Sequence, residues 1–154
     1  EAAILAYRAA LKVTVEPAPD HYQLFVDACL AARGKYLDEA LRVLDQGLAA
    51  GGSIDLLQGM ALEVELRAGR TDAALQRLES VIAQKKRLPF LYTRKAEILA
   101  DAGRMAEAGK ALISARGALT AVSGKRRQAK VYTDLEQQIA ALGAHVGLQA
   151  SAAR

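Results

Sequence analysis

Residues of the same type recur 34 positions apart in this chain, and the period constrains the fold more than any other sequence feature. The matching columns are Ala40/Ala74/Ala108, Leu44/Leu78/Leu112, Leu30/Val64/Ile98 and Gly69/Gly103, with Gly34 one position early. A fixed period of this length is typical of one supersecondary unit repeated along the chain. A single unit cannot bury its apolar face alone, so the period predicts units that stack on their neighbours.

Each unit has the pattern of two helices joined by a glycine turn. The small residue and the leucine of the second helix are four positions apart, as in Ala74 and Leu78, so they share one face. The small residue lets two helices approach closely, and the leucine fills the space beyond it. The chain holds 33 Ala and 22 Leu, the strongest helix formers, against only 15 Val and Ile. The composition argues against a β-sandwich, a barrel or a parallel-sheet enzyme and predicts an all-α fold.

Local signals place the helix ends. Asp20 is expected to cap the first hairpin, with Gln23 completing a capping box. Ser53 and Thr71 are expected to cap later helices, and Pro89 to open the third hairpin. The expected helices span about 20–33, 37–50, 54–69 and 72–86; the third hairpin begins at Pro89 and turns at Gly103, and its second helix runs on from about Met105.

The spacing resembles that of the tetratricopeptide repeat (TPR) family over about residues 20–120. The third unit carries the resemblance best, through Tyr92, Ala96, Leu99, Gly103, Ala108, Leu112 and Ala115. Lys95 departs from the usual leucine, and the proline near the end of each unit is absent. The resemblance implies an α-solenoid of stacked antiparallel hairpins with flanking helices. One domain over 1–154 is expected, with its parts at 1–19 (partial repeat or cap helix), 20–52, 53–87, 88–122, 123–145 (capping helix) and 146–154 (frayed tail).

The N-terminal flank has two interpretations. Ala6 and Ala10 stand 34 positions before Ala40 and Leu44. Residues 2–15 are therefore either the second helix of an earlier unit, in a chain that begins within a repeat, or an independent capping helix. In the first case, apolar side chains of this helix, Ile4 and Leu11, would be exposed and would favour self-association.

The C-terminal flank repeats apolar residues at steps of three and four, from Tyr132 through Leu135 and Ile139 to Leu142. This pattern predicts an amphipathic helix over about 127–142 that caps the array.

No residue set predicts catalysis, so the chain is not expected to be an enzyme. The two histidines, His21 and His145, cannot be placed beside a nucleophile. Glu63 and Glu65 are two apart on a helix and face different directions. Cys29, the only cysteine, is interpreted as a packing residue rather than a reactive thiol. No metal or cofactor is expected.

The TPR resemblance implies that the first helices of the hairpins line a concave groove. Apolar groove residues such as Phe25, Met60 and Phe90 would anchor a peptide or partner helix, and Arg67 and Arg94 would orient a carboxylate or carbonyl. The chain has no Asn, which disfavours the two-carboxylate clamp of the family. The alternative is that a terminal helix folds into the groove and buries these residues. The groove residues carried over are Tyr22, Phe25, Val26, Leu56, Met60, Glu63, Arg67, Phe90, Arg94 and Glu97.

Charge is distributed unevenly. Residues 85–130 hold 12 basic and 3 acidic residues, a balance of +9, whereas residues 1–84 have a balance of −4. The basic stretch suggests binding to nucleic acid or an acidic partner as an alternative function, although few aromatics accompany the charges.

A non-catalytic protein–protein interaction module, acting as a scaffold or adaptor, is the favoured function. A third possibility is an accessory domain of a larger enzyme. The high alanine content and the lack of Asn suggest a GC-rich bacterial genome, with cytoplasm and periplasm both open.

Overall fold

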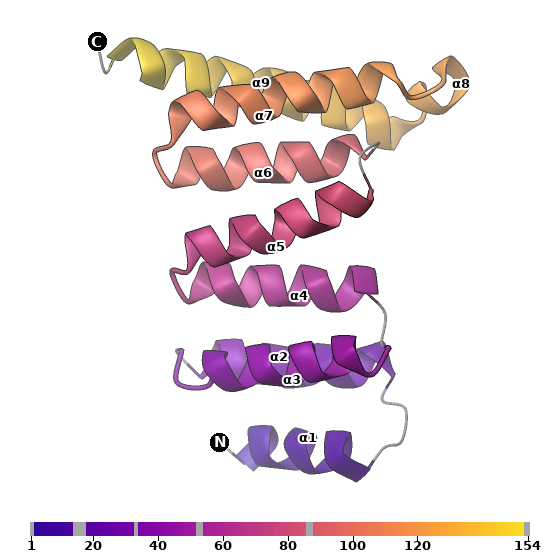
Figure 1. Cartoon of the computed structure of the whole chain (residues 1–154), viewed down its shortest axis with the longest axis vertical. Helices are drawn as coiled ribbons and strands as arrows, with labels where there is room; N and C mark the ends of the chain where they lie inside the picture. Colours follow the sequence, from indigo (N-terminus) through magenta and orange to yellow (C-terminus); the bar gives the residue numbers. More distant parts are fainter. Residues whose placement is uncertain (1, 14–17, 33, 52–53, 86–87, 153–154) are drawn as a thin grey trace. The chain divides into compact units, whose positions relative to one another are not determined.

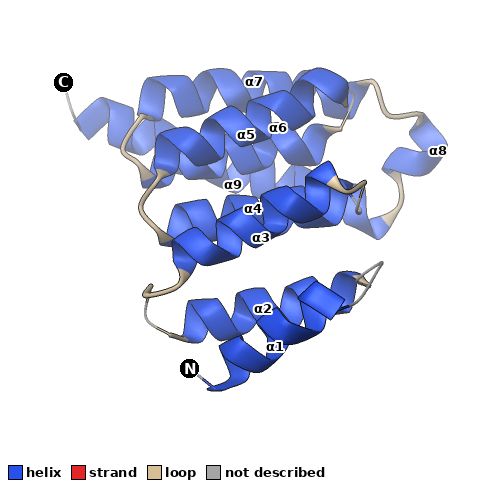
Figure 2. Cartoon of the chain, turned by 60° about the horizontal axis from the view of Figure 1, so that its bottom comes forward, coloured by secondary structure: helices blue, strands red, loops and turns tan. Residues whose placement is uncertain are grey.

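The computed structural model describes residues 2–13, 18–32, 34–51, 54–85 and 88–152. All regular elements in these ranges are helices, and no strand occurs among them (Figures 1 and 2). The all-α prediction is therefore confirmed. The helices are α1 (Ala2–Val13), α2 (Pro19–Ala31), α3 (Leu37–Ala49), α4 (Ile54–Arg67), α5 (Thr71–Gln84), α6 (Pro89–Asp101), α7 (Met105–Thr120), α8 (Gly124–Arg127) and α9 (Lys130–Ala152).

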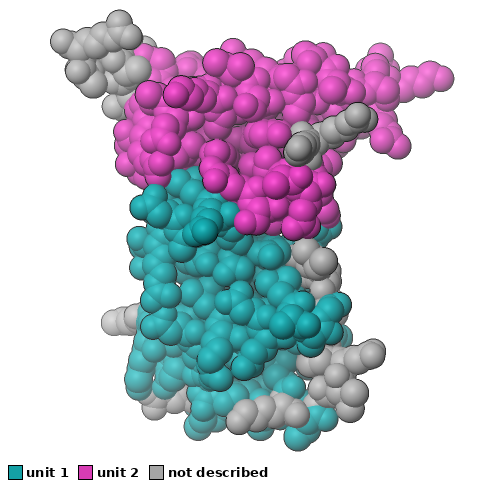
Figure 3. Space-filling view, in the orientation of Figure 1, with its two compact units in different colours: residues 1–77 teal, residues 78–154 magenta. Residues whose placement is uncertain are grey.

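The chain divides into two compact units, Glu1–Arg77 and Leu78–Arg154, with the division inside α5 (Figure 3). In unit 1, α2 packs against α1, α3 and α4, and α3 also packs against α4. In unit 2, α6 packs against α7, and α9 packs against both of them and against α8.

The 34-residue period coincides with burial. The three alanines Ala40, Ala74 and Ala108 are each 0% exposed. The leucines four positions later, at 44, 78 and 112, are also buried. Side chains at these equivalent positions therefore form the core of the hairpins, as the pairing of a small with a large residue predicts.

The glycine turns are confirmed. Gly34, Gly51, Gly69 and Gly103 all have positive φ, from +71° to +84°. A residue with a side chain is strained in this left-handed conformation, whereas glycine adopts it freely after a helix end. These four residues therefore end the helices α2, α3, α4 and α6.

The start of α2 differs from the prediction. Pro19 occupies its first turn, the extended Ala18 is the N-cap, and no side chain caps the helix. Asp20 lies inside the first turn, and Gln23 Nε2 donates instead to Asp27 Oδ1 at 2.8 Å. The capping box was wrong because α2 begins at Pro19, one residue before Asp20, so Asp20 lies inside the helix and not at its N-cap.

Two other expected caps have different outcomes. Ser53 lies outside the described residues, and Thr71 is the first residue of α5. Pro89 opens α6, as predicted.

The packed face of α1 is not the predicted one. Ile4 is 2% exposed and Leu11 packs against the same core, whereas Ala6 is exposed. The exposure of Ile4 and Leu11 that the partial-repeat interpretation implied does not occur, since α1 packs against α2. The large apolar side chains that α1 does expose are Leu5, at 58%, and Val13, at 81%.

At the other end, α9 runs beyond the expected 127–142 and continues to Ala152. It begins at Lys130, because the short α8 precedes it. Leu135, Ile139 and Val146 are buried on its packed face, so the helix packs beyond residue 142. None of the described helices combines the length and the apolar character needed to cross a membrane.

Candidate partner-binding grooves

The two aromatic residues expected in the groove of unit 1 are buried in its core, as are Val26 and Met60. Phe25 is 0% exposed and Tyr22 is 7% exposed. The ring of Tyr22 lies against Gly47 of α3, where a Cβ atom would be only 2.8 Å from the ring carbons. Both aromatics therefore stabilise the packing of α2 rather than present a surface to a partner.

The other five residues expected in the groove of unit 1 lie together. They line a depression between α2 and α4 with a volume of about 380 Å³, here named the α2–α4 groove. Its lining consists of Gln23, Val26, Asp27, Leu30, Asp55, Leu56, Gly59, Met60, Glu63 and Arg67. The first helices of two consecutive hairpins therefore form its walls.

The floor of the α2–α4 groove is apolar. Val26 and Met60 are 2% and 6% exposed, and Leu56 is 40% exposed. A Cβ atom built at Gly59 would have no neighbour within 4 Å. Because Gly59 has no side chain, the apolar floor stays open at this point of α4.

The rim of the α2–α4 groove is charged. Arg67 Nε donates to Glu63 Oε1 at 3.0 Å, one turn away on the same helix. Together with Asp27 and Asp55, the lining carries three carboxylates and one guanidinium, a formal balance of −2. A partner's carboxylate would therefore have to compete for Arg67 with Glu63, which already accepts a hydrogen bond from it.

The expected groove residues of the third hairpin have different neighbours. The Phe90 ring centroid lies 5.6 Å from that of Tyr132 on α9, with the rings tilted by 42°. Arg94 Nη1 donates to Glu97 Oε2 at 3.2 Å, and Glu97 also accepts from Gln138 of α9. The C-terminal helix therefore contacts this face of α6 but does not bury it, since Phe90 keeps 37% exposure.

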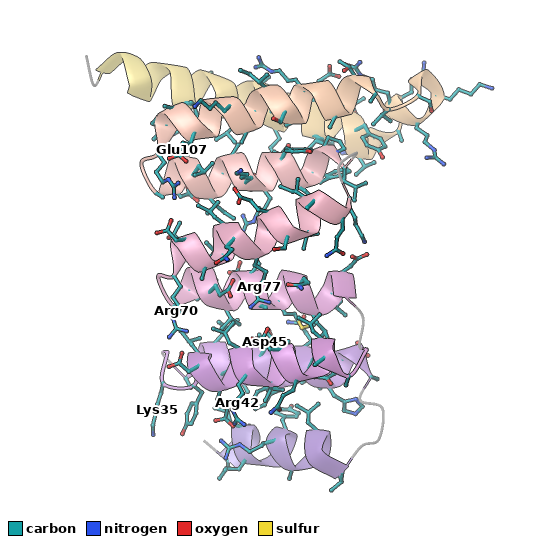
Figure 4. The ribbon with its side chains drawn as sticks, in the orientation of Figure 1. Lys35, Arg42, Asp45, Arg70, Arg77 and Glu107 are labelled. Atoms are coloured by element: carbon teal, nitrogen blue, oxygen red, sulfur yellow. The ribbon has the colours of Figure 1, made fainter. Side chains whose placement is uncertain are left out.

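A second depression of unit 1 was not predicted. The α3–α5 groove, about 620 Å³ in volume, is lined by Asp38, Leu41, Arg42, Asp45, Gln46, Ala49, Glu65, Arg70 and Arg77 (Figure 4). Its centre is an ion pair: Arg77 Nη2 lies 2.8 Å from Glu65 Oε1, with the two side chains 17% and 7% exposed. Arg77 Nε also donates to both Glu65 oxygens at 3.0 Å.

The Nη1 group of Arg77 has partners on α4 and on one further helix, α3. It donates to Gln58 Oε1 of α4 at 3.1 Å and to Asp45 Oδ1 of α3 at 3.2 Å. The hydrogen bond and charge of Glu65 raise the pKa of Arg77 above its ordinary value. The network ties three helices together and is structural, because its donors and acceptors are already paired.

Part of this network has a signal in the sequence. The prediction that Glu63 and Glu65 face different directions is confirmed, since Glu63 lines the α2–α4 groove and Glu65 meets Arg77. The pairs Asp38–Arg70 and Asp45–Arg77 both span 32 positions, near the repeat length. Opposite charges about one repeat apart, with the acid on α3 and the arginine on α5 or immediately before it, are the pattern that would have found them.

Part of the positive charge of the basic stretch 85–130 is paired. Five of its described cations form ion pairs: Arg94–Glu97, Lys95–Glu79, Arg104–Glu107, Arg127–Glu136 and Lys130–Asp134. The Arg104 guanidinium lowers the pKa of Glu107 by hydrogen bonding. Carboxylates from outside the stretch, such as Glu79 and Glu136, thus offset part of its charge.

Cys29 is 0% exposed within the core of unit 1. Burial and, to a lesser extent, the charge of Glu39 raise the pKa of its thiol to about 11, against the opposing charge of Arg8. Arg8 of α1 in turn donates to Glu39 of α3 at 2.6 Å. The thiol is therefore protonated at neutral pH, and it is not a ready nucleophile.

Among the described residues, no three His, Cys, Asp or Glu side chains gather in a way that would hold a metal ion. Among the described residues, the α2–α4 groove has an open apolar floor, whereas the α3–α5 groove contains the paired Arg77 network. The chain matches no protein-family model, no curated protein and no solved structure.

Proposed function

We propose that this chain is a TPR-like α-solenoid that acts as a non-catalytic protein–protein interaction module and binds a segment of a partner protein in the α2–α4 groove. The stacking of hairpins is supported by the contacts of α2, which packs against its own hairpin partner α3 and against α4, the first helix of the next hairpin. Such nearest-neighbour packing is what a helical repeat array requires.

The observation that carries the binding proposal is the open apolar floor at Gly59. Leu56 is 40% exposed beside a glycine whose missing side chain leaves space above the helix. The groove volume of about 380 Å³ falls within the range of roughly 300–1,000 Å³ found for ligand pockets. An apolar side chain of a partner would fill this space and bury Leu56.

The test is a selection of random peptides displayed on phage against the native chain and two glycine variants. Gly59→Leu fills the groove, and Gly117→Leu places the same side chain on α7, where a Cβ atom also meets nothing within 4 Å. Both variants should fold, because leucine favours a helix more than glycine does. Circular dichroism checks this.

We expect peptides to be enriched on the native chain and on Gly117→Leu but not on Gly59→Leu. Equal enrichment on Gly59→Leu, or none on the native chain, would contradict binding in this groove.

A further inference from the structure

The charges around the α2–α4 groove indicate which kind of partner segment fits it. Asp27 comes from α2, and Asp55 and Glu63 come from α4, so both walls carry carboxylates. The lining has a single cation, Arg67, which donates to Glu63. Its positive charge offsets that of Glu63, so the negative charges of Asp27 and Asp55 remain. The groove lining therefore has a net formal charge of −2, and its carboxylates lie next to the apolar floor formed by Leu56 and Met60.

Resting on the proposed function, we infer that the occupant of the α2–α4 groove is a basic amphipathic segment of a partner protein. Its apolar side chains bury Leu56 and cover the gap at Gly59, and its Lys or Arg side chains pair with Asp27 and Asp55. An acidic segment would be repelled by both walls, since like charges in a partly desolvated interface cost binding free energy. This preference is opposite to the expectation that Arg67 orients a carboxylate.

The occupant is a different protein rather than a second copy of this chain. The basic residues of the chain are concentrated in 85–130, where described cations such as Lys95, Arg127 and Lys130 pair with carboxylates of their own unit. Other cations of this stretch, such as Lys110 and Arg116, lie on α7, which is already packed against α6 and α9, so a second copy could present them only as part of its folded unit. A segment from another protein has no such constraint.

The experiment measures the binding of three synthetic peptides by fluorescence anisotropy. Each has about 14 residues, roughly four helical turns, with Leu at helical spacing. The remaining positions are Lys in the first peptide, Glu in the second and Gln in the third. The receptors are the native chain, Gly59→Leu, Asp27→Asn/Asp55→Asn, and the charge-matched control Asp101→Asn/Asp134→Asn, whose residues do not line the groove.

We expect the Lys peptide to bind the native chain and the control alike, and Gly59→Leu to abolish this binding. Removing the two groove carboxylates should weaken binding by about tenfold at low salt, and added salt should reduce the difference. The Glu peptide should not bind.

Three results would overturn the inference, and they separate it from the proposed function. Binding of the Glu or Gln peptide as tightly as the Lys peptide, still lost in Gly59→Leu, would refute the basic partner and retain the groove. Binding that Gly59→Leu leaves unchanged, or no binding of any peptide, would refute the groove itself. A native dimer that Gly59→Leu converts to a monomer in sedimentation would identify the occupant as a second copy.

Discussion

Two equivalent pairs of helices, α4 with α5 and α6 with α7, have different residue types at the same repeat positions. The first pair has a charged residue at each position, and the second has an apolar one. Glu65 and Arg77 form the buried ion pair. Thirty-four positions later stand Leu99 and Ala111, which are 1% and 5% exposed. Both arrangements fill the contact between two helices, but only the ionic one needs further partners, because a buried guanidinium must have its donors satisfied. The repeat therefore fixes which positions are buried and leaves their chemistry open.

The first helices of the hairpins differ in a second way. Tyr22 and Phe90 are 68 positions apart, at equivalent places on α2 and α6. Tyr22 is accommodated by Gly47 of α3, whereas Phe90 meets Tyr132 of α9. Tyr22 is thus buried in the core of unit 1. Phe90, at the equivalent position of unit 2, packs instead against Tyr132 of α9.

The largest expected effect on stability comes from breaking the buried ion pair between Glu65 and Arg77. Arg77→Ala leaves Glu65 buried without its partner and should lower the free energy of unfolding by about 3–5 kcal/mol. Glu65→Leu/Arg77→Ala copies the residues of the α6–α7 hairpin and should recover most of this loss. Urea unfolding followed by circular dichroism measures both.

The control for this prediction is Arg104→Ala, which removes an exposed cation from the pair with Glu107. Its effect should be much smaller, since water replaces the partner of an exposed charge. If the double variant were no more stable than Arg77→Ala, the two hairpins would not be interchangeable at this position.

The next effect concerns Cys29, which stands 34 positions before Glu63 but is buried in the core of unit 1. Its folded pKa is raised from 9.0 to about 11, so the folded chain keeps a proton that the unfolded chain loses between these values. Stability should therefore fall as pH rises through this window, by on the order of 2 kcal/mol.

Cys29→Ala separates this effect from the other groups that titrate at high pH. The native chain should lose stability relative to Cys29→Ala between pH values of about 9 and 11, measured by urea unfolding at each pH. A constant difference between the two chains would show that the thiol titrates alike in the folded and unfolded states.

A third, smaller effect tests the place of Tyr22. Gly47→Ala puts a Cβ atom 2.8 Å from the ring of Tyr22, although Ala115, 68 positions later, is buried without difficulty. Overpacking typically costs about 1–3 kcal/mol, and part of this is offset by the better helix propensity of alanine. We expect a net destabilisation of about 1 kcal/mol in thermal or urea unfolding.

Gly59→Ala is the matched control, because its Cβ atom meets no neighbour within 4 Å. This variant should gain about 0.5–1 kcal/mol from helix propensity alone. If Gly47→Ala were stabilised to the same extent, the Tyr22 ring would not be held against α3.

Some of these features could be predicted from the sequence alone, and others could not. The 34-residue period and the glycines predicted the helical hairpins, their turns and the buried alanines, because those features depend on residues close in sequence. The burial of Tyr22 and Phe25 was not predicted, since the first helix of a hairpin touches several neighbours and periodicity does not say which one an aromatic faces. The open gap at Gly59 likewise depends on what the neighbouring helices leave uncovered.

The hydrogen-bond partners of Arg77 could not be predicted from the sequence either. Its partners lie 12, 19 and 32 positions away, so no spacing within one helix brings them together. The division between Glu63 in the groove and Glu65 in the core was predictable, because two residues two apart on a helix face different directions. The identity of the partner of each carboxylate required the packing of three helices.

The smallest effect tests whether α9 holds the aromatic of unit 2. Phe90 and Tyr132 are in ring contact at 5.6 Å, and such pairs contribute about 0.5–1.5 kcal/mol beyond the area they bury. A double-mutant cycle of Phe90→Ala and Tyr132→Ala should give a coupling free energy in this range. The adjacent Val131, which is 53% exposed, provides the control, and its cycle with Phe90 should give a coupling near zero. A zero coupling for Tyr132 as well would mean that α9 does not secure Phe90. The face of α6 would then be as available to a partner as the α2–α4 groove, and the difference between the two units would reduce to the buried residues of their hairpins.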